Sequence, residues 1–444
     1  MSSRGGKEKE SPRGVNLDVK LDVCEVIAAI AVLNKACDID VYDSVKPLQN
    51  ALGGLVTAAR RLVQREDTAK NGCIIRVTRV KKAHKKNGRV GGMLLPVKVD
   101  SSDAKETLLN PQRCYVCKEF YYKLHFFYDS MCLKCAFFNY AKRMQTGDLR
   151  GKRAIVTGGR IKIGFQIALK LLRAGATVVV TTRFPRDALK LYKQQDDWND
   201  WETRLTIYQL DFLNGRKLLM FCQKMASEPL HILINNAAQT IARPDSFYHD
   251  LLKSEGDKPS LDLNRLEGDD RQYFPSGQVD ENGIQVDLRP KNTWDTRLEE
   301  TPFKELLDVT AINYIGPYVL MKQLHPALLR AEPRSFVVNV SAMEGNYRCH
   351  KTGYHAHTNG AKAALNMLTR TVGRVWADQE IYVTSVDTGW ITNEYPIKPG
   401  DSPNRYHPPH DEVDGAARVL DPIFAAGETP SYGVFLKDYK QRSW

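Results

Sequence analysis

From residue 153 onward, the hydrophobic positions of the chain alternate between two patterns. A short apolar run, "RAIVT", is followed by a glycine-bearing turn, by apolar residues at three- and four-residue steps, and by a second apolar run, "TVVVTT". Short apolar runs bounded by turn residues predict buried strands, and the spacing between them predicts an amphipathic helix. Strands that alternate with helices in this way predict an α/β fold, a doubly wound parallel sheet with helices on both faces.

Residues 15–105, which precede this region, show a different pattern. Two stretches, residues 22–36 and 43–66, carry apolar residues at helical spacing. Two β-rich runs then flank Asn87-Gly88, a dipeptide typical of hairpin turns. We therefore expect a helical and hairpin region, preceded by a polar, disordered tail of residues 1–14.

Charge divides the chain near the same place. Residues 1–150 contain 27 Lys and Arg against 16 Asp and Glu, which gives +11 of the total of +12 and leaves +1 for the remainder. Near the predicted hairpin tip lies a basic cluster of Arg79, Lys81, Lys82, Lys85, Lys86 and Arg89. Two interpretations stay open, a solvated edge protected by its charge and a patch that binds RNA or an acidic protein partner.

Composition narrows the class of protein. The chain is 42% hydrophobic and 26% charged, as is usual for soluble proteins, and no apolar run approaches the roughly 18 residues that span a bilayer. The N-terminal residues mix acids with bases and lack the apolar core of a secretory signal. We predict a cytoplasmic or nuclear protein without membrane contact, and a homo-oligomer is left open.

The cysteines of residues 106–145 predict a metal site. Two residues lie between Cys114 and Cys117, fourteen residues follow Cys117, and Cys132 and Cys135 again have two residues between them. Two such pairs are typical of a structural Zn²⁺ site, whereas disulfides are disfavoured without a secretion signal. Four thiolates leave no open coordination position, so hydrolytic zinc chemistry is disfavoured. The module resembles a zinc ribbon or half of a RING finger.

Several motifs follow one another between residues 150 and 444. They are Thr157-Gly158-Gly159-Arg160-Ile161-Lys162-Ile163-Gly164, "LDFLN" at 210–214, Asn235-Asn236-Ala237-Ala238, Asn313, Ser341 within "VVNVSAMEG", Lys362 within "KAAL", and Gly389 with Thr392. In this order they resemble the short-chain dehydrogenase/reductase family over about residues 146–444. The resemblance implies a Rossmann fold that binds a dinucleotide and a small-molecule substrate.

The resemblance also implies roles for individual residues. The turn from Thr157 to Gly164 would hold the pyrophosphate at a helix N-terminus, where free N–H groups and the helix dipole favour an anion. Asp211 would lie near the adenine and Asn235 near its ribose, and Thr392 would lie by the nicotinamide amide. The remaining implied positions are Ala237 and Gly389 for the cofactor, and Asn313, Ser341 and Lys362 for the catalytic set.

The choice of cofactor follows from charge. At the end of the second strand, where an NAD-selective site carries a carboxylate, the chain reads Thr181-Thr182-Arg183. An arginine can pair with a 2′-phosphate, and Arg160 and Lys162 add positive charge, so we predict NADP(H). Lys162 stands where the family usually has glycine, although some relatives that resemble pteridine reductases carry a basic residue there. If Lys162 forces a different turn, the dinucleotide would bind weakly.

The proton donor is the main departure from the family. A tyrosine usually lies four residues before the lysine, but here that residue is Thr358, whose aliphatic hydroxyl is a poor acid. One alternative is a relocated donor, Tyr354, which on a continuous helix would share a face with Thr358 and Lys362. His355 and His357 flank the position and could relay a proton, or could be surface or capping residues.

Two irregular segments should determine the substrate. Residues 241–300 are acidic and rich in turn residues, which predicts a surface excursion or lid, and residues 393–411 are rich in proline. Two functions stay open. The first is an NADP(H)-dependent oxidoreductase with an atypical active site. The second is a non-catalytic dinucleotide-binding scaffold whose zinc module and basic region bind a partner.

Overall fold

The computed structural model describes residues 106–256, 270–279, 285–392, 394 and 408–444. Except for residues 108–110, they belong to one compact unit. The helices, hairpin and basic cluster expected within residues 1–105 lie outside the described residues and stay predictions. In the described part of the chain, no helix combines the length and apolar character that a bilayer crossing requires.

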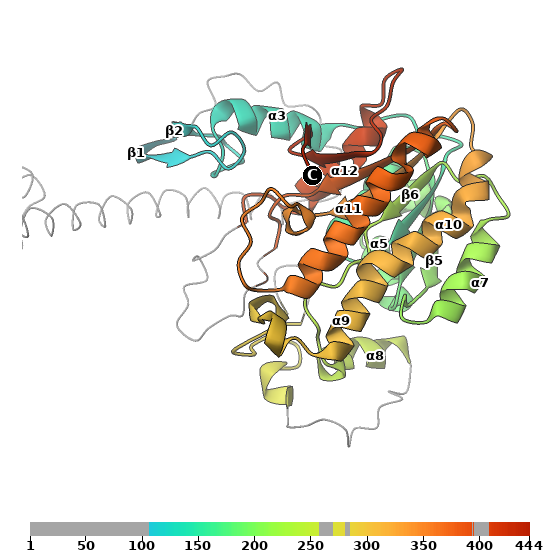
Figure 1. The fold of residues 1–444 in the computed structure, drawn as a ribbon, viewed down its shortest axis with the longest axis horizontal. Coiled ribbons are helices and arrows are strands. Elements are labelled where there is room, and N and C mark those ends of the chain that lie inside the picture. The colour runs from blue at the N-terminus through green and yellow to red at the C-terminus, as the bar shows by residue number, and fades with distance from the viewer. Residues whose placement is uncertain (1–105, 257–269, 280–284, 393, 395–407) are drawn as a thin grey trace, which may run out of the picture. The chain divides into compact units, whose positions relative to one another are not determined.

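An eight-stranded sheet forms the centre of the fold (Figure 1). Its order is β10-β9-β8-β7-β6-β3-β4-β5, and every pairing is parallel except that of β10 with β9. The strands are β3 (Arg153–Thr157), β4 (Thr177–Thr182), β5 (Leu205–Gln209), β6 (Ile232–Asn235), β7 (Ser335–Ser341), β8 (Ile381–Asp387), β9 (Val434–Lys437) and β10 (Lys440–Arg442). This arrangement confirms the predicted doubly wound α/β fold.

Helices connect the strands and cover both faces of the sheet. They are α4 (Lys162–Arg173), α5 (Pro185–Lys193), α6 (Trp198–Trp201), α7 (Gly215–Met225), α8 (His249–Glu255), α9 (Phe303–Thr310), α10 (Gly316–Leu329), α11 (Ala356–Ala377) and α12 (Glu412–Phe424). A π-helical turn, Ala311–Ile315, joins α9 to α10. Short 3₁₀ turns lie at Glu202–Arg204, Asp245–Tyr248, Asp270–Tyr273, Thr293–Asp295, Leu298–Glu300 and Met343–Gly345.

Strand alternation builds two separate cores. In β3, Ala154 and Val156 face a core shared with α4 and α12, whereas Ile155 between them faces a core shared with α7 and α10. Successive side chains of a strand point to opposite faces, so a strand buried on both faces is apolar throughout. In Figure 1, α10 and α11 run side by side across one face of the sheet.

The sheet changes direction at β3, and this positions the site. The chain passes from β3 to β4 and β5 on one side, and then returns to place β6 on the other side. Loops at the carboxyl ends of β3 and β6 therefore diverge, which opens a crevice at the point where open α/β sheets bind ligands.

The cysteine-bearing module consists of β1 (Glu106–Arg113), β2 (Phe120–Leu124) and α3 (Leu133–Met144), with β1 and β2 antiparallel. A buried ionic network fixes it to α12. Arg143 on α3 pairs with Asp411 at 2.5 Å and with Asp414 at 3.0 Å, and Tyr128 donates to Asp414 at 2.5 Å. The carboxylates of Asp411 and Asp414 also form the capping box of α12. The same two side chains therefore cap the helix and bind the module.

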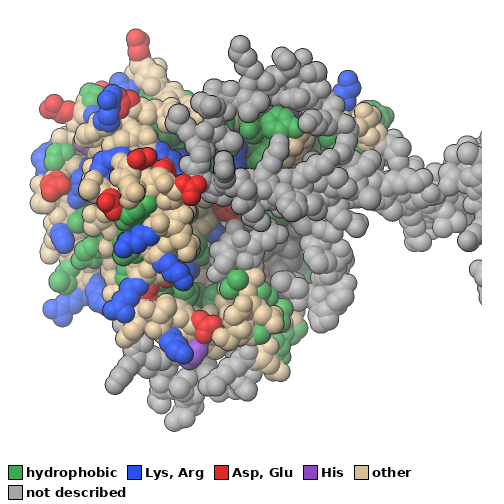
Figure 2. All heavy atoms as spheres, turned by 180° about the vertical axis from the view of Figure 1, so that it is seen from behind, with side chains coloured by type: hydrophobic (Ala, Val, Ile, Leu, Met, Phe, Trp, Pro, Cys, Tyr) green, Lys and Arg blue, Asp and Glu red, His purple; other side chains and the backbone are tan. Residues whose placement is uncertain are grey.

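Part of the long insertion packs on the domain. Glu255, at the end of α8, accepts hydrogen bonds from the backbone N–H groups of Arg186 and Asp187 and thereby satisfies the first turn of α5. Residues 257–269, 280–284 and 395–407 lie outside the described residues, so the predicted lid is described only in part. On the face shown in Figure 2, lysine and arginine side chains are interspersed with acids, in keeping with the near-neutral balance of the main body.

Candidate functional site

A cleft of about 680 Å³ lies at the carboxyl ends of the strands. The cleft is lined by the turn between β3 and α4, the segments that follow β4, β5, β6, β7 and β8, the first turns of α11, the start of the insertion and Lys437 of β9. Tyr115 of the cysteine-bearing module also lines it. Most of the residues predicted from the sequence lie in or beside this cleft.

The turn between β3 and α4 is held tightly against β6. Gly158 has a φ of +68°, and a Cβ at Gly164 would lie 2.2 Å from the carbonyl oxygen of Gly158, so neither position admits a side chain. Asn236 donates to the carbonyl oxygens of Thr157 and Gly158, and the Thr157 hydroxyl accepts from the backbone of Asn236. These contacts leave the N-terminus of α4 facing the cleft, as anion binding requires.

Lys162 has a backbone conformation that is unusual for a residue with a side chain. Its φ is +54°, in the left-handed region that is unfavourable for residues with a Cβ. Glycine adopts this region readily, so a φ of this sign is compatible with the glycine usual in the family, and the effect of Lys162 on dinucleotide binding stays a prediction. Among the described residues the ammonium of Lys162 has no hydrogen-bond or ion-pair partner, and the residue lines the cleft.

The two arginines near this turn differ in their pairing. Arg160 lines the cleft and forms a 2.6 Å ion pair with Asp187, so part of its charge is balanced there, and its contribution to NADP(H) binding stays a prediction. Arg183 is exposed at the end of β4, and its guanidinium lies 4.6 Å from the ring centre of Tyr248 and 5.3 Å from that of Phe184. Within the described part of the chain Arg183 has no acidic partner.

The adenine-side predictions hold only in part. Asp211 lines the cleft and accepts from the backbone of Leu213, and Ala237 lines the cleft beside Gly158. The side chain of Asn235 does not line the cleft and needs correction. It is 2% exposed and donates to Asn339 at 2.7 Å, because β6 and β7 pair at these two positions.

Ser341, Thr358 and Lys362 line the same cleft from β7 and α11. The Ser341 hydroxyl donates to the side chain of Asn366 at 2.6 Å, and the Lys362 ammonium donates to the carbonyl oxygen of Val340 at 2.8 Å. Burial lowers the pKa of Lys362 to about 8, against an opposing contribution from Glu344. The Thr358 hydroxyl is buried and has no hydrogen-bond partner among the described residues.

Tyr354 lies outside the cleft, because helix α11 begins only at Ala356. His355 precedes it with a φ of +42°, which breaks the continuous helix on which the relocated-donor alternative depended. The backbone of Tyr354 instead forms an isolated antiparallel β-bridge with that of Arg297, and the Arg297 guanidinium lies 5.9 Å from the centre of the Tyr354 ring. The prediction that Tyr354 shares a helical face with Thr358 and Lys362 is wrong.

The two histidines also lie away from the cleft. The His355 ring stacks on Trp294 with the ring centres 4.0 Å apart, and its Nδ1 lies 3.0 Å from the carbonyl oxygen of Trp294. His357 is buried against Glu305 of α9, with 3.3 Å between Nε2 and Oε1. His355 occupies the N-cap position of α11, as the capping alternative has it, whereas His357 is buried and is neither a surface nor a capping residue.

Asn313 supports the cleft from behind. It lies in the π-helical turn, where it accepts from the backbone N–H of Gln239 and donates to the carbonyl oxygen of Gln239. Because Gln239 lines the cleft, Asn313 positions the loop after β6. Turns of this kind occur frequently at functional sites.

The loop after β8 holds the last predicted positions. Gly389 has a φ of +79°, and its backbone N–H donates to the carboxylate of Asp387 at 2.7 Å. The Thr392 hydroxyl donates to the carboxylate of Glu394 at 2.6 Å. Asp387 pairs with Lys437 of β9 at 3.0 Å. Sequence analysis missed Asp387, Lys437 and Tyr115, since only the fold brings these residues to one wall of the cleft.

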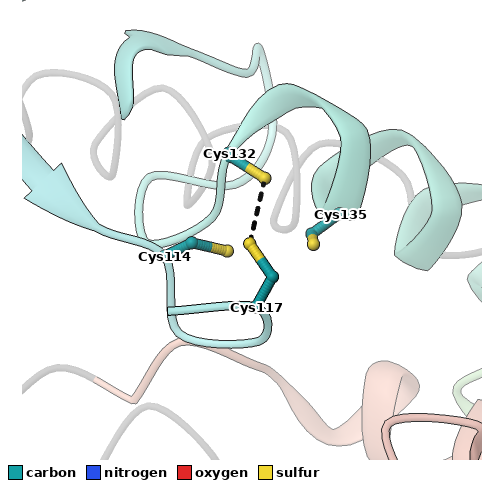
Figure 3. A group of neighbouring side chains, drawn as sticks. All are labelled: Cys114, Cys117, Cys132 and Cys135. Atoms are coloured by element: carbon teal, nitrogen blue, oxygen red, sulfur yellow. Dashed lines mark hydrogen bonds between the residues drawn. The ribbon is translucent and has the colours of Figure 1, made fainter. Parts of the chain in front are cut away.

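The four cysteines predicted as ligands converge on one point (Figure 3). Their Sγ atoms all lie within 4.8 Å of one another, and those of Cys117 and Cys132 are 3.7 Å apart. Ligands at a Zn–S distance of about 2.3 Å in a tetrahedron would be about 3.8 Å apart. The donor set and its dimensions therefore fit a zinc ion.

Comparison with known families identifies the main domain. A family model for short chain dehydrogenases matches residues 152–255, and a model for enoyl-(acyl carrier protein) reductases matches residues 288–405. The chain belongs to the short-chain dehydrogenase/reductase family. The intervening residues 256–287 fall largely in the insertion that the sequence predicts.

Individual proteins that are similar to this chain differ widely from it in sequence. An uncharacterized protein of Acanthamoeba polyphaga mimivirus is 36% identical over 369 residues, which cover 78% of each chain. The 2-dehydro-3-deoxy-D-gluconate 5-dehydrogenase of Formosa agariphila is 23% identical over 55% of this chain and 71% of its own. An NADPH-bound carbonyl reductase from chicken fatty liver is 18% identical, covers 67% of this chain and 100% of its own, and gives a TM-score of 0.45.

Proposed function

We propose that the protein is an NADP(H)-dependent oxidoreductase that reduces a carbonyl or an activated C=N or C=C bond, with Lys362 as the source of the proton. The observation that carries the proposal is one cleft with an anion-binding turn at one end and Ser341, Thr358 and Lys362 at the other. The two ends belong to one continuous cavity, as a dinucleotide with a reacting nicotinamide requires.

At the nucleotide end, the described side chains fit a phosphorylated ribose. Arg183 is exposed and stacked on Tyr248, and the ammonium of Lys162 faces the same cleft. Guanidinium groups bind phosphate through two parallel hydrogen bonds. The end of β4 carries Thr182 in place of an acid, so no carboxylate repels a 2′-phosphate at this position and Arg183 can attract it.

At the reaction end, the residues can supply a proton and bind an oxygen atom. A bound NADPH supplies a hydride to the carbon of the substrate. The Ser341 hydroxyl is positioned by Asn366, and Lys362 has two ammonium hydrogens left after its bond to Val340. Thr358 lies one helical turn before Lys362, and its unpaired hydroxyl can accept from the lysine and donate to the substrate oxygen. Lys362 recovers its proton from solvent.

The nucleotide assignment predicts a preference that Arg183 controls. Arg183→Ala is expected to weaken NADPH binding about tenfold or more, because one charge-assisted contact is lost, and to leave NADH binding unchanged. The measurement is fluorescence titration of the purified full chain with both cofactors. Arg186→Ala, which removes a neighbouring exposed arginine outside the cleft, is the matched control. Equal affinity of the wild type for NADPH and NADH would contradict the proposal.

We also propose that Cys114, Cys117, Cys132 and Cys135 hold a structural zinc ion. The support is the convergence of the four sulfur atoms within 4.8 Å of one another, and the ion would hold β1, β2 and α3 together in one module. Four thiolates complete the coordination shell, which gives the metal a structural role.

Metal analysis should find about one zinc ion per chain. The double variant Cys114→Ser/Cys132→Ser is expected to lose it, together with the native proteolytic resistance of residues 106–145. Cys349→Ser, which changes a cysteine outside the cluster, should keep it. A metal-free wild type with an intact module would refute the assignment.

The second candidate, a non-catalytic dinucleotide-binding scaffold, rests on the missing tyrosine. It predicts NADPH binding without turnover on any carbonyl, imine or enone of a broad panel. The expected RNA or acidic-protein partner of the basic region falls on residues outside the described part and stays a prediction.

A further inference from the structure

Tyr115 connects the cysteine cluster to the wall of the cleft. It lies between two of the zinc-binding cysteines, and its side chain, half-buried, lines the same cleft as Asp387 and Lys437. Its hydroxyl accepts a 3.1 Å hydrogen bond from the backbone N–H of Trp390. Trp390 belongs to the loop after β8, between Gly389 and Thr392.

The backbone of Tyr115 is fixed by the turn that presents the thiolates. Tyr115 donates to the carbonyl oxygen of Ser130 at 2.8 Å, and within the turn Cys114 donates to Glu119 at 2.8 Å while Lys118 donates back to Cys114 at 3.1 Å. The position of the phenol therefore depends on the geometry of the cluster.

A second contact fixes the ring. Tyr115 meets His410 edge to face with the ring centres 5.1 Å apart, and His410 also occupies the space that a Cβ of Gly389 would need, 2.8 Å from it. Arg418 of α12 lies 2.9 Å from His410 and donates to Asn139 of α3 at 2.6 Å. The module, α12 and the loop after β8 are thus joined around one tyrosine.

We propose that Tyr115 is a positioning residue of the cleft, through which the zinc module fixes the loop that carries the nicotinamide end of the cofactor. The inference rests on the proposed function, because it needs a dinucleotide in this cleft. It assigns the module an indirect part in cofactor binding, through the loop after β8. The residue acts through Trp390 and takes no part in the chemistry.

The test uses the full-length protein and two ligands that differ in one respect. NADPH carries a nicotinamide, whereas 2′,5′-ADP has only the adenosine end. Tyr115→Phe removes the hydroxyl and leaves the ring, and it is expected to weaken NADPH binding about two- to tenfold while the affinity for 2′,5′-ADP stays unchanged. Tyr122→Phe, an exposed tyrosine of the same module, is the matched control.

A readout without any ligand separates this inference from the proposed function. Hydrogen exchange of the Trp390 amide should be faster in Tyr115→Phe than in the wild type. Exchange should be faster still in the wild type after a chelator has removed its metal, with zinc content measured in parallel. Unchanged exchange in Tyr115→Phe and in the metal-free protein would overturn the inference. If the wild type bound neither ligand, the proposed function would fail, and the exchange data would still decide whether Tyr115 fixes the loop.

Discussion

Lys362→Met is expected to lower the rate of carbonyl reduction by about 10²-fold or more at saturating NADPH, because the proposed general acid is removed. Lys362 is buried at the reaction end of the cleft, beside Ser341 and Thr358. In the described part of the cleft no tyrosine lies at the family position to take over the proton. The measurement is kcat for the best substrate of a carbonyl panel.

The same assignment fixes the direction of the pH dependence. Burial lowers the pKa of Lys362 to about 8, so the ammonium that donates the proton predominates only below that pH. Reduction is therefore expected to fall as pH rises through about 8, and oxidation of the corresponding alcohol to rise, since oxidation needs the neutral amine. A reduction rate that stays constant from pH 7 to 9 would contradict the role of Lys362.

Two further variants separate this role from general damage to the protein. Lys322→Met changes an exposed lysine on α10 and should leave kcat unchanged. Thr358→Tyr places a phenol one turn before Lys362 and is expected to raise reduction about tenfold or more, since phenols are better acids than aliphatic hydroxyls. If the wild type turned over nothing while NADPH bound, the scaffold alternative would be favoured.

Arg143→Met is expected to lower the free energy of unfolding by about 3–5 kcal/mol, because it leaves the carboxylates of Asp411 and Asp414 buried without their main counter-charge. The side chain of Arg143 is 12% exposed and that of Asp414 is 1% exposed. The measurement is urea unfolding of the zinc-loaded protein.

A surface pair of the same type provides the comparison. Arg173 binds Asp197 with two hydrogen bonds, but its side chain is 34% exposed, so Arg173→Met should change the unfolding free energy by about 1 kcal/mol or less. Adding Asp411→Asn to Arg143→Met should recover part of the loss, because one of the two buried charges is neutralised. Equal losses for Arg143→Met and Arg173→Met would show that burial does not strengthen the Arg143 network.

Local patterns were sufficient to predict the parallel sheet and the turn from Thr157 to Gly164. Each depends on residues close together in the chain, where strand alternation and glycine positions act directly. The spacing to Lys362 also favoured Thr358 over Tyr354, and it is Thr358 that lines the cleft.

Contacts between distant segments could not be predicted in the same way. Arg143 and Asp411 are 268 positions apart, and Trp390 and Tyr115 are 275 positions apart, so no local pattern relates them. The start of α11 was also hidden, because His355 takes a left-handed conformation that glycine usually adopts, and nothing in the local sequence indicates it. Asn235 was misassigned because the register of β6 with β7 directs its amide toward Asn339.

The hydrogen bond from Tyr128 to Asp414 spans 286 positions, so its two partners are synthesised at different times. At about 5–20 residues per second, a ribosome needs roughly 15–60 s to reach Asp414 after it has added Tyr128. During that interval Arg143 has neither of its carboxylate partners, Asp411 and Asp414. Docking of the module on α12 therefore cannot precede the synthesis of Asp411 and Asp414, and a nascent chain arrested before residue 411 would leave the guanidinium of Arg143 open to other proteins.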